Sequence, residues 1–76
     1  MNEELLNTVY RKGFAKLGTK ESLVLPYVVT RYKEYCKQII NENPTLDLAL
    51  LVQMASIYLH FLLQNPEIKI HVDKEP

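Results

Sequence analysis

The sequence predicts an all-α fold, a three-helix domain that ends in a short strand-like tail. Apolar residues recur at the three-and-four spacing of amphipathic helices through most of the 76-residue chain. Glycine and proline residues interrupt that pattern at intervals of ordinary helix length. With 47% hydrophobic and 24% charged residues, the composition is that of a globular protein. Residues 1–76 are expected to form one domain, because this length leaves no room for a second core.

The first helix is expected over residues 3–17. Asn2 can cap its start, and Gly18 supplies the left-handed residue that ends many helices. Gly13 interrupts the apolar face at a cost of up to about 1 kcal/mol relative to alanine. This cost favours close approach of another helix, and the alternative is a merely tolerated weak spot. The apolar face holds Leu6, Val9, Tyr10, Phe14 and Leu17.

The second helix is expected over residues 23–42, and its start has two interpretations. Ser22 can cap a helix that has Pro26 in its first turn, or Ser22–Leu25 can be extended with the helix beginning at Pro26. Both interpretations agree from Pro26 onward. The apolar face holds Val28, Val29, Tyr32, Tyr35, Cys36, Ile39 and Ile40.

The third helix is expected over residues 45–64, with Pro44 at its first position and Asn43 or Thr45 as its cap. It is apolar on two sides. One side, the Leu50 seam, consists of Leu46, Leu50, Met54, Ile57 and Phe61. The other side, the Leu59 seam, consists of Leu48, Val52, Ala55, Leu59 and Leu62. The polar stripe consists of Gln53, Ser56, His60 and Gln64.

Two apolar seams are more than a surface helix of a small domain usually buries. We expect the first two helices to cover the Leu50 seam. The Leu59 seam is then left as the oligomer interface of a helical homodimer, because an exposed leucine forgoes about 1.5–3 kcal/mol of burial. The polar stripe either faces solvent or crosses a helix–helix interface, with a metal or pH-sensing role for His60 as the remaining alternative.

The tail is expected to be extended over residues 67–72, where apolar and polar residues alternate strictly. Ile68, Ile70 and Val72 share one side. Such a strand needs a partner, which is either Ser22–Leu25 or the same tail of a second subunit. Otherwise its apolar side chains pack on the helices.

Few residues offer catalytic chemistry. Cys36 and His60 are the one pair that suggests a nucleophile and its base, but Cys36 lies on an apolar face, where burial raises a thiol pKa. No metal-ligand spacing or cofactor motif is present. The expectation is a binding protein with no cofactor, no metal and no enzymatic activity.

The expected location is cytoplasmic, away from any membrane. Cys36 is the single cysteine, so no disulfide forms within the chain, and no secretory leader is visible. The apolar run from Leu48 to Leu63 is shorter than the roughly 20 residues that a membrane-spanning helix needs.

Basic residues concentrate in the middle of a chain whose net charge is zero, with acidic residues toward both ends. This distribution is compatible with an acidic partner, although most such charge is simply solvated. Six residues are candidates for contacting a partner: Tyr27, Arg31, Lys33, Lys37, Arg11 and Lys12. The last helix is too apolar to read DNA as a recognition helix, so nucleic acid would have to contact the first two helices.

A family resemblance bears on the same question. A helix ending in Lys16-Leu17-Gly18-Thr19, a helix with Tyr27, Tyr32 and Tyr35, and a last helix opened by Asn43-Pro44-Thr45-Leu46 follow one another. This order resembles the small terminase subunits of tailed phages, although the spacing departs from that family's and the last helix is more apolar. The resemblance implies a helical, oligomeric protein of phage or bacterial origin that recognises DNA for packaging.

The expected function is protein interaction. The chain would be a homo-oligomeric regulatory or assembly factor, most simply a dimer, that docks on a larger protein partner. The alternative is a nucleic-acid-binding regulator or phage packaging factor that uses the basic first two helices.

Overall fold

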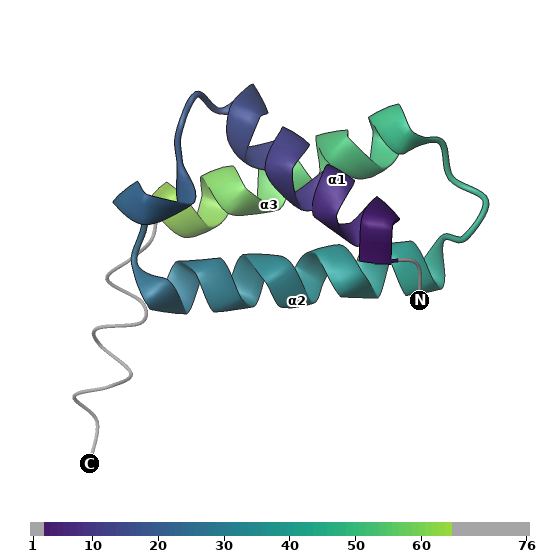
Figure 1. The fold of residues 1–76 in the computed structure, drawn as a ribbon, viewed down its shortest axis with the longest axis horizontal. Helices are drawn as coiled ribbons and strands as arrows, with labels where there is room; N and C mark the ends of the chain where they lie inside the picture. Colours follow the sequence, from purple (N-terminus) through teal and green to yellow (C-terminus); the bar gives the residue numbers. More distant parts are fainter. Residues whose placement is uncertain (1–2, 65–76) are drawn as a thin grey trace, which may run out of the picture.

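The computed structural model describes residues 3–64, which form three α-helices around one core (Figure 1). The elements are α1 (Glu3–Lys16), the short 3₁₀ helix η1 (Glu21–Leu23), α2 (Pro26–Glu42) and α3 (Leu48–Gln64). Helices α2 and α3 run in opposite directions, and α1 lies across them (Figure 1). The predicted all-α architecture is confirmed, and no strand occurs between residues 3 and 64. The predicted tail at 67–72 lies outside the described residues.

Helix α1 ends one residue earlier than predicted, through backbone bonds around Gly18. Gly18 has φ 68°, a left-handed conformation that glycine adopts without strain. Its N–H donates to Ala15 O at 3.0 Å, and the N–H of Thr19 donates to Phe14 O at 3.2 Å. These two bonds form a Schellman motif, which satisfies carbonyls that a helix end otherwise leaves open.

Helix α2 begins at Pro26, three residues later than the predicted 23–42 range and as the second interpretation requires. Leu25 is the N-cap residue, with φ −59° and ψ 139°, and its carbonyl accepts from Val28 and Val29. Proline fits the first helical position because its missing N–H would have no partner there. The segment before it is only partly extended, since η1 occupies Glu21–Leu23.

Helix α3 also begins three residues later than the predicted 45–64. Pro44 and Thr45 belong to a turn that is closed by Leu46 N donating to Asn43 O at 3.1 Å. The carbonyl of Asp47 then accepts from Leu50 and Leu51. Pro44 therefore belongs to a turn and is not the first residue of the helix. The fixed φ of proline suits both positions.

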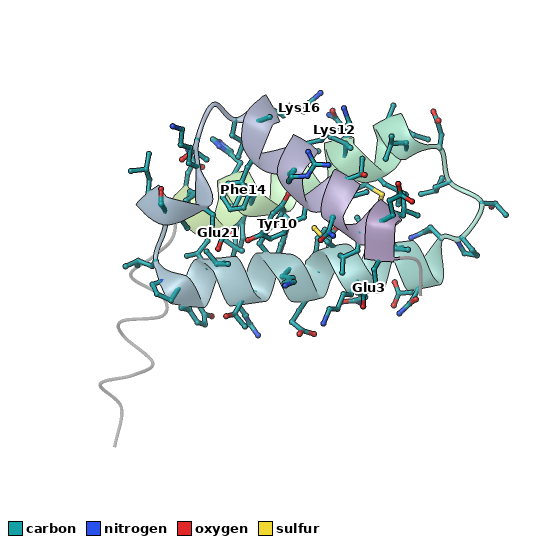
Figure 2. All side chains as sticks on the ribbon, in the orientation of Figure 1. Glu3, Tyr10, Lys12, Phe14, Lys16 and Glu21 are labelled. Carbon is teal, nitrogen blue, oxygen red and sulfur yellow. The ribbon has the colours of Figure 1, made fainter. Side chains whose placement is uncertain are left out.

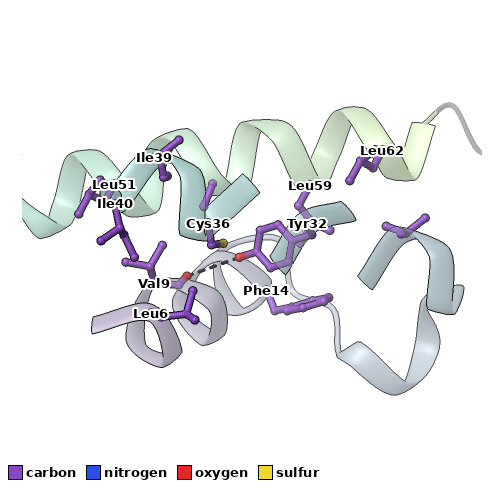
Figure 3. Packing of buried hydrophobic residues seen from close by; sticks show 12 residues of the cluster. Leu6, Val9, Phe14, Tyr32, Cys36, Ile39, Ile40, Leu51, Leu59 and Leu62 are labelled. Carbon is purple, nitrogen blue, oxygen red and sulfur yellow. Dashed lines mark hydrogen bonds between the residues drawn. The ribbon is translucent and has the colours of Figure 1, made fainter. Parts of the chain in front are cut away.

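The core is organised around Tyr32, which is fully buried (Figure 3). Its hydroxyl donates to the Tyr10 carbonyl oxygen at 2.8 Å, and its ring centroid lies 5.1 Å from that of Phe14. A Cβ atom added to Gly13 would collide with the Tyr32 hydroxyl and would lie 3.6 Å from Ala55 Cβ. The predicted close approach at Gly13 is confirmed, because both α2 and α3 contact α1 there.

Candidate protein-interaction surface

The Leu59 seam forms the inner side of α3. Val52, Ala55, Leu59 and Leu62 are buried within the single chain, and Leu48, in the first turn, is 37% exposed. The prediction that this seam is the oligomer interface therefore needs correction, because four of its five residues are already used in the core. The physical reason is size: small Ala55 lets α1 pack closely at Gly13, and the bulky Leu50 seam offers no such approach.

The Leu50 seam is the exposed side of α3, although the first two helices were expected to cover it. Leu50 is 50% exposed, Ile57 is 59% exposed and Phe61 is 52% exposed. Met54 and Leu46 are partly buried and pack against the edge of the core. A continuous apolar strip thus runs along α3 on the surface of the chain.

An aromatic groove adjoins this strip where α3 meets α2. Tyr35 of α2 and Tyr58 of α3 stack with their ring centroids 4.2 Å apart and their planes at 25°. Phe61 continues the row, 6.4 Å from Tyr58 between centroids. Met54 and Ile57 complete the lining of a groove of about 370 Å³. Partial burial raises the pKa of Tyr35, so its hydroxyl stays neutral at physiological pH.

The polar stripe divides in two. Gln53, His60 and Gln64 are exposed and border the Leu50 seam, because they lie at neighbouring angles on the helix. Ser56 is only 3% exposed, and its hydroxyl donates to the Gln53 carbonyl oxygen at 2.9 Å. Its polar group is satisfied within α3, so it can lie against the core.

The basic candidates do not form one positive patch. The Arg31 guanidinium lies 5.6 Å from the Tyr27 ring centroid, a cation–π distance. Lys37 pairs with Glu34 at 3.9 Å.

Arg11 of α1 and Lys33 of α2 line the same groove of about 570 Å³, which is also lined by Glu4 and Glu21. Glu21 accepts a hydrogen bond from the Tyr10 hydroxyl at 2.8 Å. Lys12 and Lys16 lie along α1, at its edge away from α2 (Figure 2).

Cys36 and His60 do not form a reactive pair. Cys36 is a free thiol buried in the core, and burial raises its pKa to about 11. His60 lies at the surface of α3. A thiol that is both protonated and shielded is a poor nucleophile. Between residues 3 and 64, no three histidine, cysteine or acidic side chains cluster closely enough to hold a metal ion.

Comparisons of the chain with models of protein families, with curated proteins and with solved structures find no match. None of the helices in the described part of the chain has the length and hydropathy that crossing a membrane requires.

The exposed Leu50 seam is the candidate site. From the sequence, the opposite side of α3, the Leu59 seam, was expected to be the exposed one. The sequence signal for the true orientation of α3 is the small size of Gly13 and Ala55, the two residues that meet at the helix crossing.

Proposed function

We propose that the chain is a protein-interaction module and not an enzyme: a homo-oligomeric regulatory or assembly protein that docks on a larger protein partner. The exposed Leu50 seam is the observation that carries this proposal. Burying apolar surface is favourable by about 25 cal/mol per Å², so a row of half-exposed Leu50, Ile57 and Phe61 side chains favours a partner. Contiguous apolar patches on small proteins commonly mark such contacts.

The chemistry of the surface favours a protein over a nucleic acid. Helix α3 contains no aspartate, glutamate, lysine or arginine. Binding to phosphates is driven by cations, and Arg11 and Lys33 share their groove with Glu4 and Glu21. Aromatic residues and methionine are enriched in protein interfaces, and the groove beside the seam is lined by Tyr35, Tyr58, Phe61, Met54 and Ile57. The free thiol of Cys36 supports a reducing, cytoplasmic setting for this function.

The test compares two lysine substitutions on α3. Ile57→Lys places a charge in the Leu50 seam, whereas Ala49→Lys places the same charge at an exposed position off both seams. Exposed substitutions of this kind usually change stability by less than about 0.5 kcal/mol, so both variants should remain folded.

Each protein is used as bait in an extract of its native host, and each is also tested for self-association. We expect Ile57→Lys to lose contacts that the wild type and Ala49→Lys retain, and any host protein so identified should bind the purified wild type directly. The proposal fails if Ile57→Lys behaves as the wild type does in both assays.

A further inference from the structure

We propose that the Leu50 seam is occupied by the Leu50 seam of a second copy of this chain, packed antiparallel about a two-fold axis that passes between Ala55 and Ser56. The inference rests on the proposed function and names the partner and the register. The proposed dimer uses a different surface from the Leu59 seam, which is already buried in the core of the single chain.

The spacing of the exposed residues is that of a helix-pairing seam. Leu50, Met54, Ile57 and Phe61 follow one another at intervals of four, three and four residues, the d-a-d-a pattern of a heptad repeat. In an antiparallel pair, a positions face d positions of the other helix. Leu50 then lies opposite Phe61 of the second copy, and Met54 opposite Ile57, so all four residues are used twice in four layers.

The flank of the seam also suits this register. Gln53 and His60 both occupy g positions, which adjoin each other in an antiparallel pair. Gln53 of one copy therefore lies beside His60 of the other, and both side chains can form hydrogen bonds. No charge on α3 is brought against its own kind. The antiparallel arrangement also sets each helix dipole against the opposite end of its neighbour.

The available apolar area is close to what a dimer interface of standard size needs. Side chains of this size expose on the order of 150–250 Å² when free. The half-exposed Leu50, Ile57 and Phe61, with smaller contributions from Met54 and the two tyrosines, therefore offer roughly 400–450 Å² of apolar surface. Interfaces are about 60% apolar, which implies a total of roughly 700 Å² per copy. The standard interface buries about 800 Å² per partner.

The first experiment measures the mass of the full chain by light scattering, from about 1 to 200 µM. We expect the wild type and Ala49→Lys to approach twice the 8.9 kDa of one chain as concentration rises. Ile57→Lys should weaken dimerisation at least about a hundredfold, since two buried isoleucines are lost per dimer. A wild type that stays monomeric, or equal weakening by both variants, would overturn the inference.

The second experiment determines orientation with full-length cysteine variants. In the antiparallel register, position 50 faces position 61 of the other copy. The two copies of position 50 are about 16 Å apart along the axis, beyond the roughly 7 Å between Cα atoms that a disulfide spans. A mixture of Leu50→Cys and Phe61→Cys chains should form disulfide-linked heterodimers on mild oxidation, while neither variant alone should cross-link.

The wild type is the control, because Cys36 is buried. Cross-linking of either variant with itself would indicate a parallel pair and would overturn the register. A monomeric wild type whose Ile57→Lys variant nevertheless loses a host protein would assign the seam to that protein. Such a result would reject the second copy as occupant and the homo-oligomeric part of the proposed function, while keeping the docking on a larger protein partner.

Discussion

Gly13→Ala is expected to destabilise the protein, although alanine is the better helix former. An added Cβ would occupy the space of the Tyr32 hydroxyl and approach Tyr32 Cζ to 3.0 Å. Tyr32 is fully buried, and its ring is held by contacts with Tyr10 and Phe14 at centroid distances of 5.1 Å. The ring cannot rotate out of the way without moving its neighbours, since core side chains are close-packed.

The size of the effect follows from three contributions. Overpacking a core typically costs about 1–3 kcal/mol. Displacement of the Tyr32 hydroxyl from the Tyr10 carbonyl oxygen, now 2.8 Å away, costs about a further 1 kcal/mol. The higher helix propensity of alanine stabilises the variant by about 1 kcal/mol. The net loss is therefore about 1–3 kcal/mol, and each kcal/mol lowers Tm by about 4–8 °C in a domain of this size.

Urea unfolding of four proteins tests this reasoning: the wild type, Gly13→Ala, Tyr32→Phe and the double variant. Without the hydroxyl, the added methyl group meets only the ring, so Gly13→Ala should cost at least about 1 kcal/mol less when residue 32 is phenylalanine. If Gly13→Ala alone stabilises the wild type by about 1 kcal/mol, as propensity by itself requires, the close packing described here is refuted.

Four further predictions concern other parts of the chain. Leu59→Asp should abolish cooperative unfolding because Leu59 is fully buried, whereas His60→Ala should be mild at its exposed position. Equal effects of the two substitutions would overturn the assignment of His60 to an exposed polar stripe. The Cys36 thiol should resist a thiol reagent at pH 8 until denaturant is added, and fast labelling of the native protein would contradict its burial. Burial raises the pKa of Cys36 from 9.0 to about 11 and also raises the pKa values of Tyr10 and Tyr32. The free energy of unfolding should therefore be constant below about pH 9 and fall as the pH rises above it, because the unfolded chain loses these protons first. A free energy of unfolding that does not change between about pH 9 and 11 would contradict this. No gel shift with DNA or RNA is expected at low salt, and a shift that weakens steeply with salt would instead favour phosphate binding by Arg11 and Lys33.

Much of the fold was predictable because local signals decide it. Gly18 marks the end of α1 through its left-handed conformation. The three-and-four spacing of apolar residues from Pro26 to Glu42 defines α2. The helix starts were less predictable, because proline suits both a first helical position and a turn. Pro26 takes the first role and Pro44 the second, and the choice depends on how the neighbouring backbone bonds are made.

The orientation of α3 was not predictable from periodicity. A repeat of about 3.6 residues shows which side chains share one side of a helix but not which side faces inward. Helix α3 has two apolar sides, so either could face the core. Packing decides it: α1 approaches where Gly13 meets Ala55, and this requires the Leu59 seam to be inside. The aromatic groove was missed for a related reason, since Tyr35 and Tyr58 lie far apart in sequence and only the antiparallel pairing of α2 and α3 stacks them.

The most direct test of the exposed Leu50 seam is urea unfolding of the wild type and Ile57→Lys over a range of chain concentrations. Dimerisation stabilises the folded state by mass action, so the wild-type urea midpoint should rise with chain concentration. Each tenfold increase in concentration adds up to about 1.4 kcal/mol to the unfolding free energy of the dimer. Ile57→Lys should unfold cooperatively at a midpoint independent of concentration, near that of the dilute wild type. A wild-type midpoint that does not move would contradict self-association through the Leu50 seam, and an Ile57→Lys chain that no longer folds would contradict the exposure of Ile57 on α3.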